Sequence, residues 1–235
     1  MIRLGRDLAP GSVLDCDLVV VGTGAGGGML LHDAARAGLR VIALEEGGYR
    51  TSKDFNAVER HMLPLLFQDS GARGTVDGAV QILQGRGVGG STVHNTNLCR
   101  RAPDPILAHW ADAFGLDGWR PDRVAADFAA VEELLHVSPI EPGRVNRNND
   151  VLLRGMQKLG WRGGLLSHNR RGCVGSGQCE MGCPFNAKEN VLKALLPAAL
   201  AAGAEVIAEA RAERVLVENG RAAGVLARAL VDGDP

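Results

Sequence analysis

The stretch that decides the fold is residues 17–48, DLVVVGTGAGGGMLLHDAARAGLRVIALEEGG. Its apolar run Leu18–Val21 predicts a short buried strand, and the run Val41–Leu44 predicts a second one. Between these runs stands the spacing G-x-G-x-x-G, followed by a predicted helix that ends near Ala37. A strand, a glycine turn, a helix and a second strand in this order predict a Rossmann βαβ unit.

Each part of this unit has a physical role in binding a dinucleotide. Gly22 lets the chain turn out of the strand, Gly24 lets the backbone approach a pyrophosphate, and Gly27 lets the helix pack close to the strand. A pyrophosphate would lie at the helix N-terminus, where unpaired N–H groups and the helix dipole favour negative charge. Glu45 ends the second strand, where a carboxylate accepts hydrogen bonds from a ribose and repels a 2'-phosphate. The unit therefore predicts FAD or NAD rather than NADP.

The composition is that of an ordinary globular protein. With 235 residues and 46% apolar content, the chain can bury a sizeable core in one or two domains. Its 26 Lys and Arg against 27 Asp and Glu leave no basic excess, which argues against nucleic acid as a partner. The N-terminus lacks an apolar leader and a twin arginine, and the run at 194–204 is too short to span a bilayer. We expect a cytoplasmic protein with no membrane span.

The rest of the chain alternates helical patterns with glycine-rich loops. Apolar spacing predicts a helix within residues 55–67, and a second glycine-rich loop, QGRGVGGSTVHNTNLCRR, follows at 84–101. Residues 106–136 predict two or three helices broken at Gly115 and Pro121, with Trp110 and Trp119 expected in the core. Further helices are predicted at 146–160 and 187–202.

The C-terminal part predicts strands. They are expected at residues 205–208, 212–218 and 223–230, with Asn219 and Gly220 as a hairpin turn. Residues 232–235, DGDP, have turn chemistry with no second strand after them. We therefore expect the chain to stop within its fold.

Taken together, these motifs resemble the glucose-methanol-choline (GMC) family of FAD-dependent oxidoreductases. The resemblance covers essentially the whole chain and is most specific in GRGVGGSTVHN, residues 85–95, with a companion in ENGRAAGV, residues 218–225. It implies an α/β, Rossmann-like FAD/NAD(P)-binding fold with helical insertions, incomplete at the C-terminus. Residues 1–235 would form part of an FAD-binding domain without a substrate domain. Its parts would be a βαβ dinucleotide unit at 15–48, a flavin loop at 84–101, a Cys-Pro loop at 172–184 and adenine-side strands at 204–231.

The resemblance also implies a set of cofactor-binding residues. Ala25, Gly26 and Glu45 would hold the ADP half, Ser91, Asn95 and Thr96 would lie against the flavin and its chain, and the backbone at Ala212 would meet the adenine. The complete candidate set is Gly22, Gly24, Ala25, Gly26, Gly27, Glu45, Arg86, Gly89, Gly90, Ser91, His94, Asn95, Thr96 and Ala212. The implied chemistry is hydride transfer from a small-molecule alcohol to flavin N5, followed by reoxidation by oxygen or another acceptor.

The chain departs from the family pattern in two ways. His94 stands where an aliphatic residue is usual, and the stretch around it resembles choline and pyranose oxidases, in which a histidine here is bonded to the flavin. Covalent FAD is thus one hypothesis, and a histidine that only packs or hydrogen-bonds near the ring is the other. The family's second signature and C-terminal histidine pair lie beyond the end of the sequence. No histidine of this chain has such a pattern, so the catalytic residues are unknown.

Five cysteines without an export signal indicate reduced thiols or a metal site. Cys173, Cys179 and Cys183 fit the ferredoxin run C-x2-C-x2-C-x3-C-P, with Ser176 in place of one cysteine. An iron-sulfur cluster with Cys16 or Cys99 as fourth ligand, a zinc site completed by His168, and a redox disulfide are the alternatives. The family resemblance favours a structural Gly-Cys-Pro loop without metal.

Several functions follow from these observations. The favoured one is the FAD-binding part of an alcohol-oxidising enzyme, either truncated or completed by a second polypeptide that carries the substrate domain. The alternatives are a flavin-holding electron-transfer module and an inactive fragment. An NAD-dependent dehydrogenase is the alternative on cofactor, but a simple NAD domain has no need of the second glycine loop at residues 85–90.

Overall fold

The computed structural model describes residues 1–230 and divides them into two compact units. The first unit contains residues 1–96 and the described chain from Gly177 onward, and the second unit contains residues 97–176. The predicted turn at 232–235 lies outside the described residues. No helix within residues 1–230 is long and apolar enough to cross a membrane.

The first unit is built on a parallel sheet of four strands with the order β1-β6-β3-β2. The strands are β1 (Ile2–Leu4), β2 (Leu18–Val21), β3 (Val41–Leu44) and β6 (Glu205–Ala208). The pairing joins the first residues of the chain to a strand near its end, because Arg3 lies opposite Ile207. The predicted βαβ strands and the predicted Rossmann-like α/β class are confirmed, whereas β1 was not expected from the sequence.

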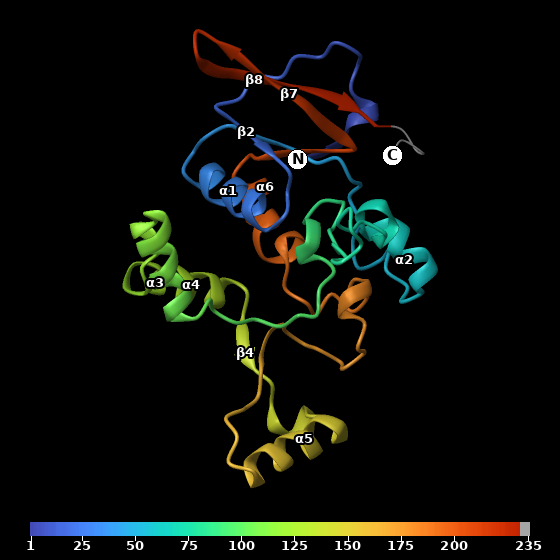
Figure 1. The fold of residues 1–235 in the computed structure, drawn as a ribbon. Coiled ribbons are helices and arrows are strands. Elements are labelled where there is room, and N and C mark those ends of the chain that lie inside the picture. Colours follow the sequence, from blue (N-terminus) through green and yellow to red (C-terminus); the bar gives the residue numbers. More distant parts are fainter. Residues whose placement is uncertain (231–235) are drawn as a thin grey trace. The chain divides into compact units, whose positions relative to one another are not determined.

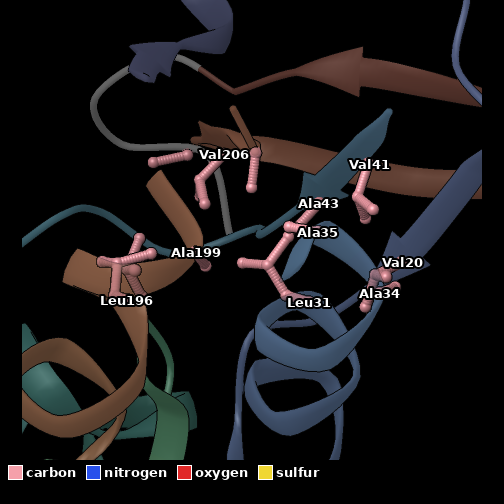
Figure 2. Packing of buried hydrophobic residues seen from close by; sticks show 12 residues of the cluster. Val20, Leu31, Ala34, Ala35, Val41, Ala43, Leu196, Ala199 and Val206 are labelled. Atoms are coloured by element: carbon pink, nitrogen blue, oxygen red, sulfur yellow. The ribbon is translucent and has the colours of Figure 1, made fainter. Parts of the chain in front are cut away.

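Helices cover one face of this sheet. Helix α1 (Ala25–Arg36) packs against α6 (Leu196–Ala201), and Figure 1 shows both on the same side of the strands. Small side chains dominate the core between sheet and helices, as Figure 2 shows, which brings the backbones close together. The buried residues of this core are Val20, Leu31, Ala34, Ala35, Val41, Ala43, Val88, Leu196, Ala199, Ala204, Val206 and Ala208.

A hairpin of β7 (Ala210–Glu218) and β8 (Arg221–Ala229) packs on the other face of the sheet (Figure 1). Its Ala210, Ala212 and Val225 join a cluster with sheet residues such as Ile42 and Ile207. The turn is the predicted one: Asn219 and Gly220 both have positive φ, 51° and 75°, as a two-residue hairpin turn that matches the strand twist requires.

Two shorter helical segments complete the first unit. Helix α2 (Glu59–Leu66) begins later than the sequence pattern indicated. The helix expected over 187–202 starts with a π-helical turn, Val191–Leu195, that runs into α6. Residues 187–190 are buried and non-helical, because the side chain of Asn190 caps the turn by accepting a hydrogen bond from Lys193 N.

The second unit is mostly helical. It contains α3 (Asp104–Phe114), α4 (Pro121–Leu134), α5 (Arg147–Lys158) and a small antiparallel pair, β4 (Val137–Pro139) with β5 (Ser167–Asn169). The breaks predicted at Gly115 and Pro121 are confirmed, since Gly115 ends α3 with φ 67° and Pro121 begins α4.

The predicted burial of two tryptophans in this unit is wrong. Trp110 and Trp119 remain 37% and 48% exposed in the described chain. Their rings pack edge to face with centroids 5.9 Å apart. They therefore lie against each other where α3 turns into the following 3-10 helix, Asp117–Trp119, and are not in a core.

Two adjacent glycines of α1 give a test of the close packing between helix and strand. A Cβ at Gly27 would overlap the carbonyl oxygen of Gly22, whereas a Cβ at Gly26 would meet open space. We expect Gly27→Ala to lower the free energy of unfolding by about 1–3 kcal/mol or more. Gly26→Ala should leave it unchanged or raise it by about 0.5–1 kcal/mol, because alanine favours helix. Urea unfolding of both variants measures this difference, and equal midpoints would contradict the packing role of Gly27.

Candidate functional site

The N-terminus of α1 presents the features of an anion site. Gly22 has φ 84° and donates its N–H to Leu44 O at 2.7 Å, which turns the chain out of β2. Gly24 is the N-cap residue, no side chain caps the helix, and its first turn carries no acidic residue. Cβ atoms at Gly24 and Gly26 would meet open space. The helix end is thus accessible to a negatively charged group.

Glu45 is buried, only 6% exposed, and is bound inside the protein. Its Oε2 accepts hydrogen bonds from Thr23 N at 3.0 Å and Thr23 Oγ1 at 2.8 Å, and its Oε1 accepts one from Gly47 N at 3.0 Å. The carboxylate therefore joins the end of β3 to the first glycine loop. A ribose would have to use the acceptor capacity that these three bonds leave.

Thr23, which the sequence did not single out, connects the two glycine loops. It is fully buried, and its Oγ1 accepts a hydrogen bond from Gly89 N at 3.1 Å while donating to Glu45. No sequence signal distinguishes Thr23, because it occupies the unspecified position x of G-x-G. Only the partner in the second loop marks it as part of the site.

The second glycine loop packs directly on the first. A Cβ at Gly90 would lie 2.8 Å from the Cα of Gly24, and Gly89 and Gly90 have φ 96° and 50°. Within the loop, Ser91 Oγ accepts a hydrogen bond from Gly85 N at 2.8 Å. Two glycine motifs about 65 residues apart are thereby brought into contact, where only glycine allows the approach.

The remaining predicted site residues of this loop differ in exposure. Ser91, Asn95 and Thr96 have exposed side chains, and Asn95 donates its side-chain N–H to Ser91 O at 3.0 Å. Arg86 is partly buried and its Nε lies 3.6 Å from a carboxylate oxygen of Glu46.

Glu46 also connects the loop to the hairpin. Its other oxygen accepts a hydrogen bond from Arg211 Nε at 3.0 Å, next to Ala212 on β7. The end of β3, the second glycine loop and the predicted adenine-side strand are thus held together by one carboxylate and two guanidinium groups. The sequence did not indicate this connection, because no motif specifies which residues Glu46, Arg86 and Arg211 contact.

His94 is the buried titratable group of the loop, at 4% exposure. Its ring centroid lies 3.8 Å from that of Phe67 at an interplanar angle of 43°, and its Nε2 has no hydrogen-bond partner among the described residues. Burial, and secondly the positive charge of Lys188, lower the pKa of His94 to about 4. The imidazole is therefore neutral near pH 7 and has an unpartnered ring nitrogen.

Of the other histidines, His168 also has a buried ring nitrogen, Nδ1, without a hydrogen-bond partner among the described residues, but it lies in the second unit. His32 is buried in α1, where its Nδ1 lies 2.7 Å from Asp33 Oδ1. Burial lowers the pKa of His168, which lies on β5 in the second unit. Cys173 belongs to that unit, and Cys179 and Cys183 belong to the first.

All five cysteines are free thiols, so the structure contains none of the disulfides considered above. Within residues 1–230, no group of three or more His, Cys, Asp or Glu side chains is arranged to hold a metal ion. The iron-sulfur and zinc hypotheses thus gain no support from the described part of the chain. The structural, metal-free loop stays a prediction, which iron and zinc analysis of the purified protein tests.

The lowered pKa of His94 predicts a pH dependence of stability. The unfolded state takes up a proton on this histidine near pH 6.5, and the folded state does so only near pH 4. The contribution of neutral His94 to the free energy of unfolding is therefore fully present above pH 6.5. It is lost as the pH falls from 6.5 to 4, by on the order of 3 kcal/mol.

In urea unfolding, the free energy of unfolding of His94→Phe should fall less between pH 7 and pH 5 than that of the wild type. The exposed His61, changed to Gln, is the control, and parallel losses in all three proteins would contradict the assignment.

Comparisons with known proteins agree with this architecture. The chain matches the family described as GMC oxidoreductase over residues 64–233. An uncharacterized GMC-type oxidoreductase of Mycobacterium tuberculosis, Rv0492c, is 42% identical over 92% of this chain, and long-chain-alcohol oxidase FAO4B of Arabidopsis thaliana is 32% identical over 87%. The matched regions are 35% and 27% of those proteins, so the chain spans about a third of the length of the relatives that it matches first.

A solved structure shows the same fold. The pyridoxine 4-oxidase from Mesorbium loti superposes with a TM-score of 0.63 at 16% identity, over 92% of this chain and 48% of that one. The family match, the relatives and the two joined glycine loops lead to one conclusion. This chain belongs to the GMC oxidoreductase family and corresponds to its N-terminal, FAD-binding part.

Proposed function

We propose that this chain holds FAD for an oxidoreductase that removes a hydride from the CH–OH group of an alcohol. The observation that carries the proposal is the contact between the two glycine loops, with Gly90 against Gly24 beside the accessible N-terminus of α1. One loop suits a pyrophosphate, and the second supplies backbone for the flavin end of a longer cofactor. The relatives include long-chain-alcohol oxidases, and the structural neighbour is a pyridoxine oxidase, which supports an alcohol as substrate.

The residues of the first unit fit FAD in chemistry. In the proposal, the glycine loop at Gly22–Gly27 holds the pyrophosphate, and Glu45 orders this loop through Thr23 while it offers its remaining acceptor capacity to the ribose. The backbone at Ala212 would meet the adenine. The second loop would hold the flavin end through Arg86, Gly89, Gly90, Ser91, His94, Asn95 and Thr96.

When bound, the flavin supplies a hydride acceptor. The residues of this chain bind and orient it, and the proton of the alcohol requires a general base within hydrogen-bond reach. We assign that base to none of the residues described here, because His32 is engaged by Asp33 and the pKa of His94, lowered to about 4, makes its imidazole a weak base. The general base is expected in the part of the relatives that this chain does not span.

The other functions considered above have less support. NAD is disfavoured by the family match and by the second glycine loop. A second polypeptide that supplies the substrate domain gains no support, since the curated relatives are single chains about three times as long as the matched region. The electron-transfer module and the inactive fragment differ from the proposal in their response to alcohols. The cytoplasmic location remains a prediction from the sequence.

The test is anaerobic reduction of the full-length protein by alcohols, followed by visible absorption. We expect the purified protein to show a flavin spectrum that bleaches on addition of a long-chain primary alcohol. Gly24→Val should fold yet lose most of the flavin, because its side chain would fill the open space at the N-terminus of α1. Gly155→Ala on α5, also in open space, is the matched control that should keep the flavin. Bound flavin that no alcohol bleaches would favour the electron-transfer module, and a colourless protein would overturn the proposal.

We further propose that FAD is attached covalently through His94. Two observations support this proposal: the lowered pKa keeps the imidazole neutral, and Nε2 is buried without a hydrogen-bond partner in the described residues. A neutral imidazole has a nitrogen lone pair that can bond to the flavin 8α-methyl carbon. That step would break a C–H bond of the methyl group and leave two electrons on the flavin, which oxygen or the other acceptor of the proposed reaction would remove.

Acid precipitation separates covalent from dissociable flavin. We expect the colour of the wild-type protein to remain in the washed pellet, and that of His94→Ala to appear in the supernatant. His61→Ala, which removes an exposed histidine from α2, should behave as the wild type. Release of all wild-type flavin into the supernatant would rule out the covalent bond.

A further inference from the structure

The buried lysine Lys188 has no role in the function proposed so far. Its side chain is 2% exposed and is among the largest fully buried side chains of the protein. A charged group is retained in such a place only where bonds to the protein replace its hydration. Its Nζ donates to the backbone carbonyl oxygens of Val93 at 3.3 Å, Asn95 at 3.0 Å and Cys179 at 3.4 Å. Three carbonyl groups thus match the three N–H donors of an ammonium group.

Two of these carbonyl groups belong to the residues on either side of His94. A backbone held at both neighbours restricts the direction in which the side chain between them points. The ring of His94 is in addition packed on Phe67, with the centroids 3.8 Å apart. The contacts of Lys188 therefore act on the one short piece of the second glycine loop that carries the buried imidazole.

The segment that carries Lys188 has its own anchors. Val191 N donates to Thr92 Oγ1 at 3.2 Å, and a Cβ at Gly28 would lie 2.7 Å from the Val191 methyl groups. Glu189, 1% exposed in its side chain, pairs with Lys193 Nζ at 2.8 Å. Lys188 thus extends from a fixed segment toward the second glycine loop.

We propose that Lys188 is a positioning residue for the second glycine loop. Lys188 hydrogen-bonds the backbone on both sides of His94, fixes the orientation of the imidazole and places a positive charge beside it. A cation in this place opposes protonation of the imidazole, in the same direction as burial. It also favours negative charge on a group bound against the loop. This second consequence rests on the proposed function, since it concerns the bound flavin, whereas the first does not.

The test uses four variants of the full-length protein. Lys188→Met removes the donors and the charge, Lys188→Gln keeps N–H donors without the charge, and Lys188→Arg keeps the charge. The matched control is Lys193→Met, which removes a lysine from the same segment. Lys193 contacts Glu189 and the carbonyl of Asn186, and neither belongs to the second glycine loop. Any general loss of stability from a missing lysine should appear in the control as well.

The first readout is the pKa of His94, measured by NMR on isotope-labelled histidine, which needs no cofactor. We expect the wild-type value at about 4 and an upward shift in Lys188→Met and Lys188→Gln. Lys188→Arg and Lys193→Met should keep the wild-type value. A wild-type pKa near that of an exposed histidine, or equal values in all variants, would overturn the proposal. If Lys188→Met does not fold, Lys188→Gln and the wild-type titration decide the question.

The second readout is the midpoint potential of the bound flavin. We expect it to become more negative in Lys188→Met and Lys188→Gln, to recover in Lys188→Arg, and to stay unchanged in Lys193→Met. Equal potentials in all five proteins would overturn the electrostatic part of the proposal. A protein that binds no flavin would refute the proposed function alone, because the pKa of His94 would still report on Lys188.

Discussion

The buried hydrogen bonds between Glu45 and Thr23 are the interaction on which the site depends. A carboxylate at 6% exposure is stable only because charge-assisted N–H and O–H donors replace water, and Thr23 supplies two of its three partners. The same hydroxyl accepts the N–H of Gly89. The side chain of Glu45, directly after β3, thereby positions the first glycine loop, and through it the second. Loss of either partner would leave a buried polar group unpaired, which costs more than the bond itself contributes.

Close backbone approach is the second requirement of this arrangement. Gly27 allows α1 to lie on the turn at Gly22, Gly28 makes room for Val191, and Gly90 meets Gly24. The alanine-rich core under the sheet has the same effect, because small side chains keep helix and strands near each other (Figure 2). The result is a set of backbone N–H groups at the N-terminus of α1 with open space before them. This is the physical basis for assigning the first unit to a large anionic cofactor.

The electrostatics of the second loop follow from burial more than from ion pairing. The ammonium group of Lys188 donates to three backbone carbonyl groups, which replace part of its hydration. His94 lies close enough to this charge for its pKa to fall further than burial alone would lower it. A neutral imidazole and a lysine ammonium group thus occur side by side. A group that gains negative charge on reduction would be stabilised in such surroundings.

Local patterns in the sequence determined the elements whose chemistry is local. The strands Leu18–Val21 and Val41–Leu44, the hairpin turn at Asn219 and Gly220, and the breaks at Gly115 and Pro121 follow from periodicity and from the backbone preferences of glycine, asparagine and proline. The family was also indicated by short motifs, and the comparisons confirm it. The prediction that Trp110 and Trp119 are buried was wrong, because a large apolar residue in a helical pattern does not show whether another element packs on that side of the helix.

Tertiary structure alone decided the contacts between distant segments. The pairing of β1 with β6, the hydrogen bond of Thr23 to the second loop, the Glu46 contacts with Arg86 and Arg211, and the grip of Lys188 on the backbone around His94 join residues far apart in the chain. No local pattern encodes such contacts, since a lysine or threonine is ordinarily a surface residue. Its burial depends on which carbonyl or carboxylate groups the folded chain places around it. The sequence by itself thus determined the dinucleotide-binding unit and the family. The folded structure decided which hydrogen bonds join the two glycine loops and which charged side chain lies beside the second loop.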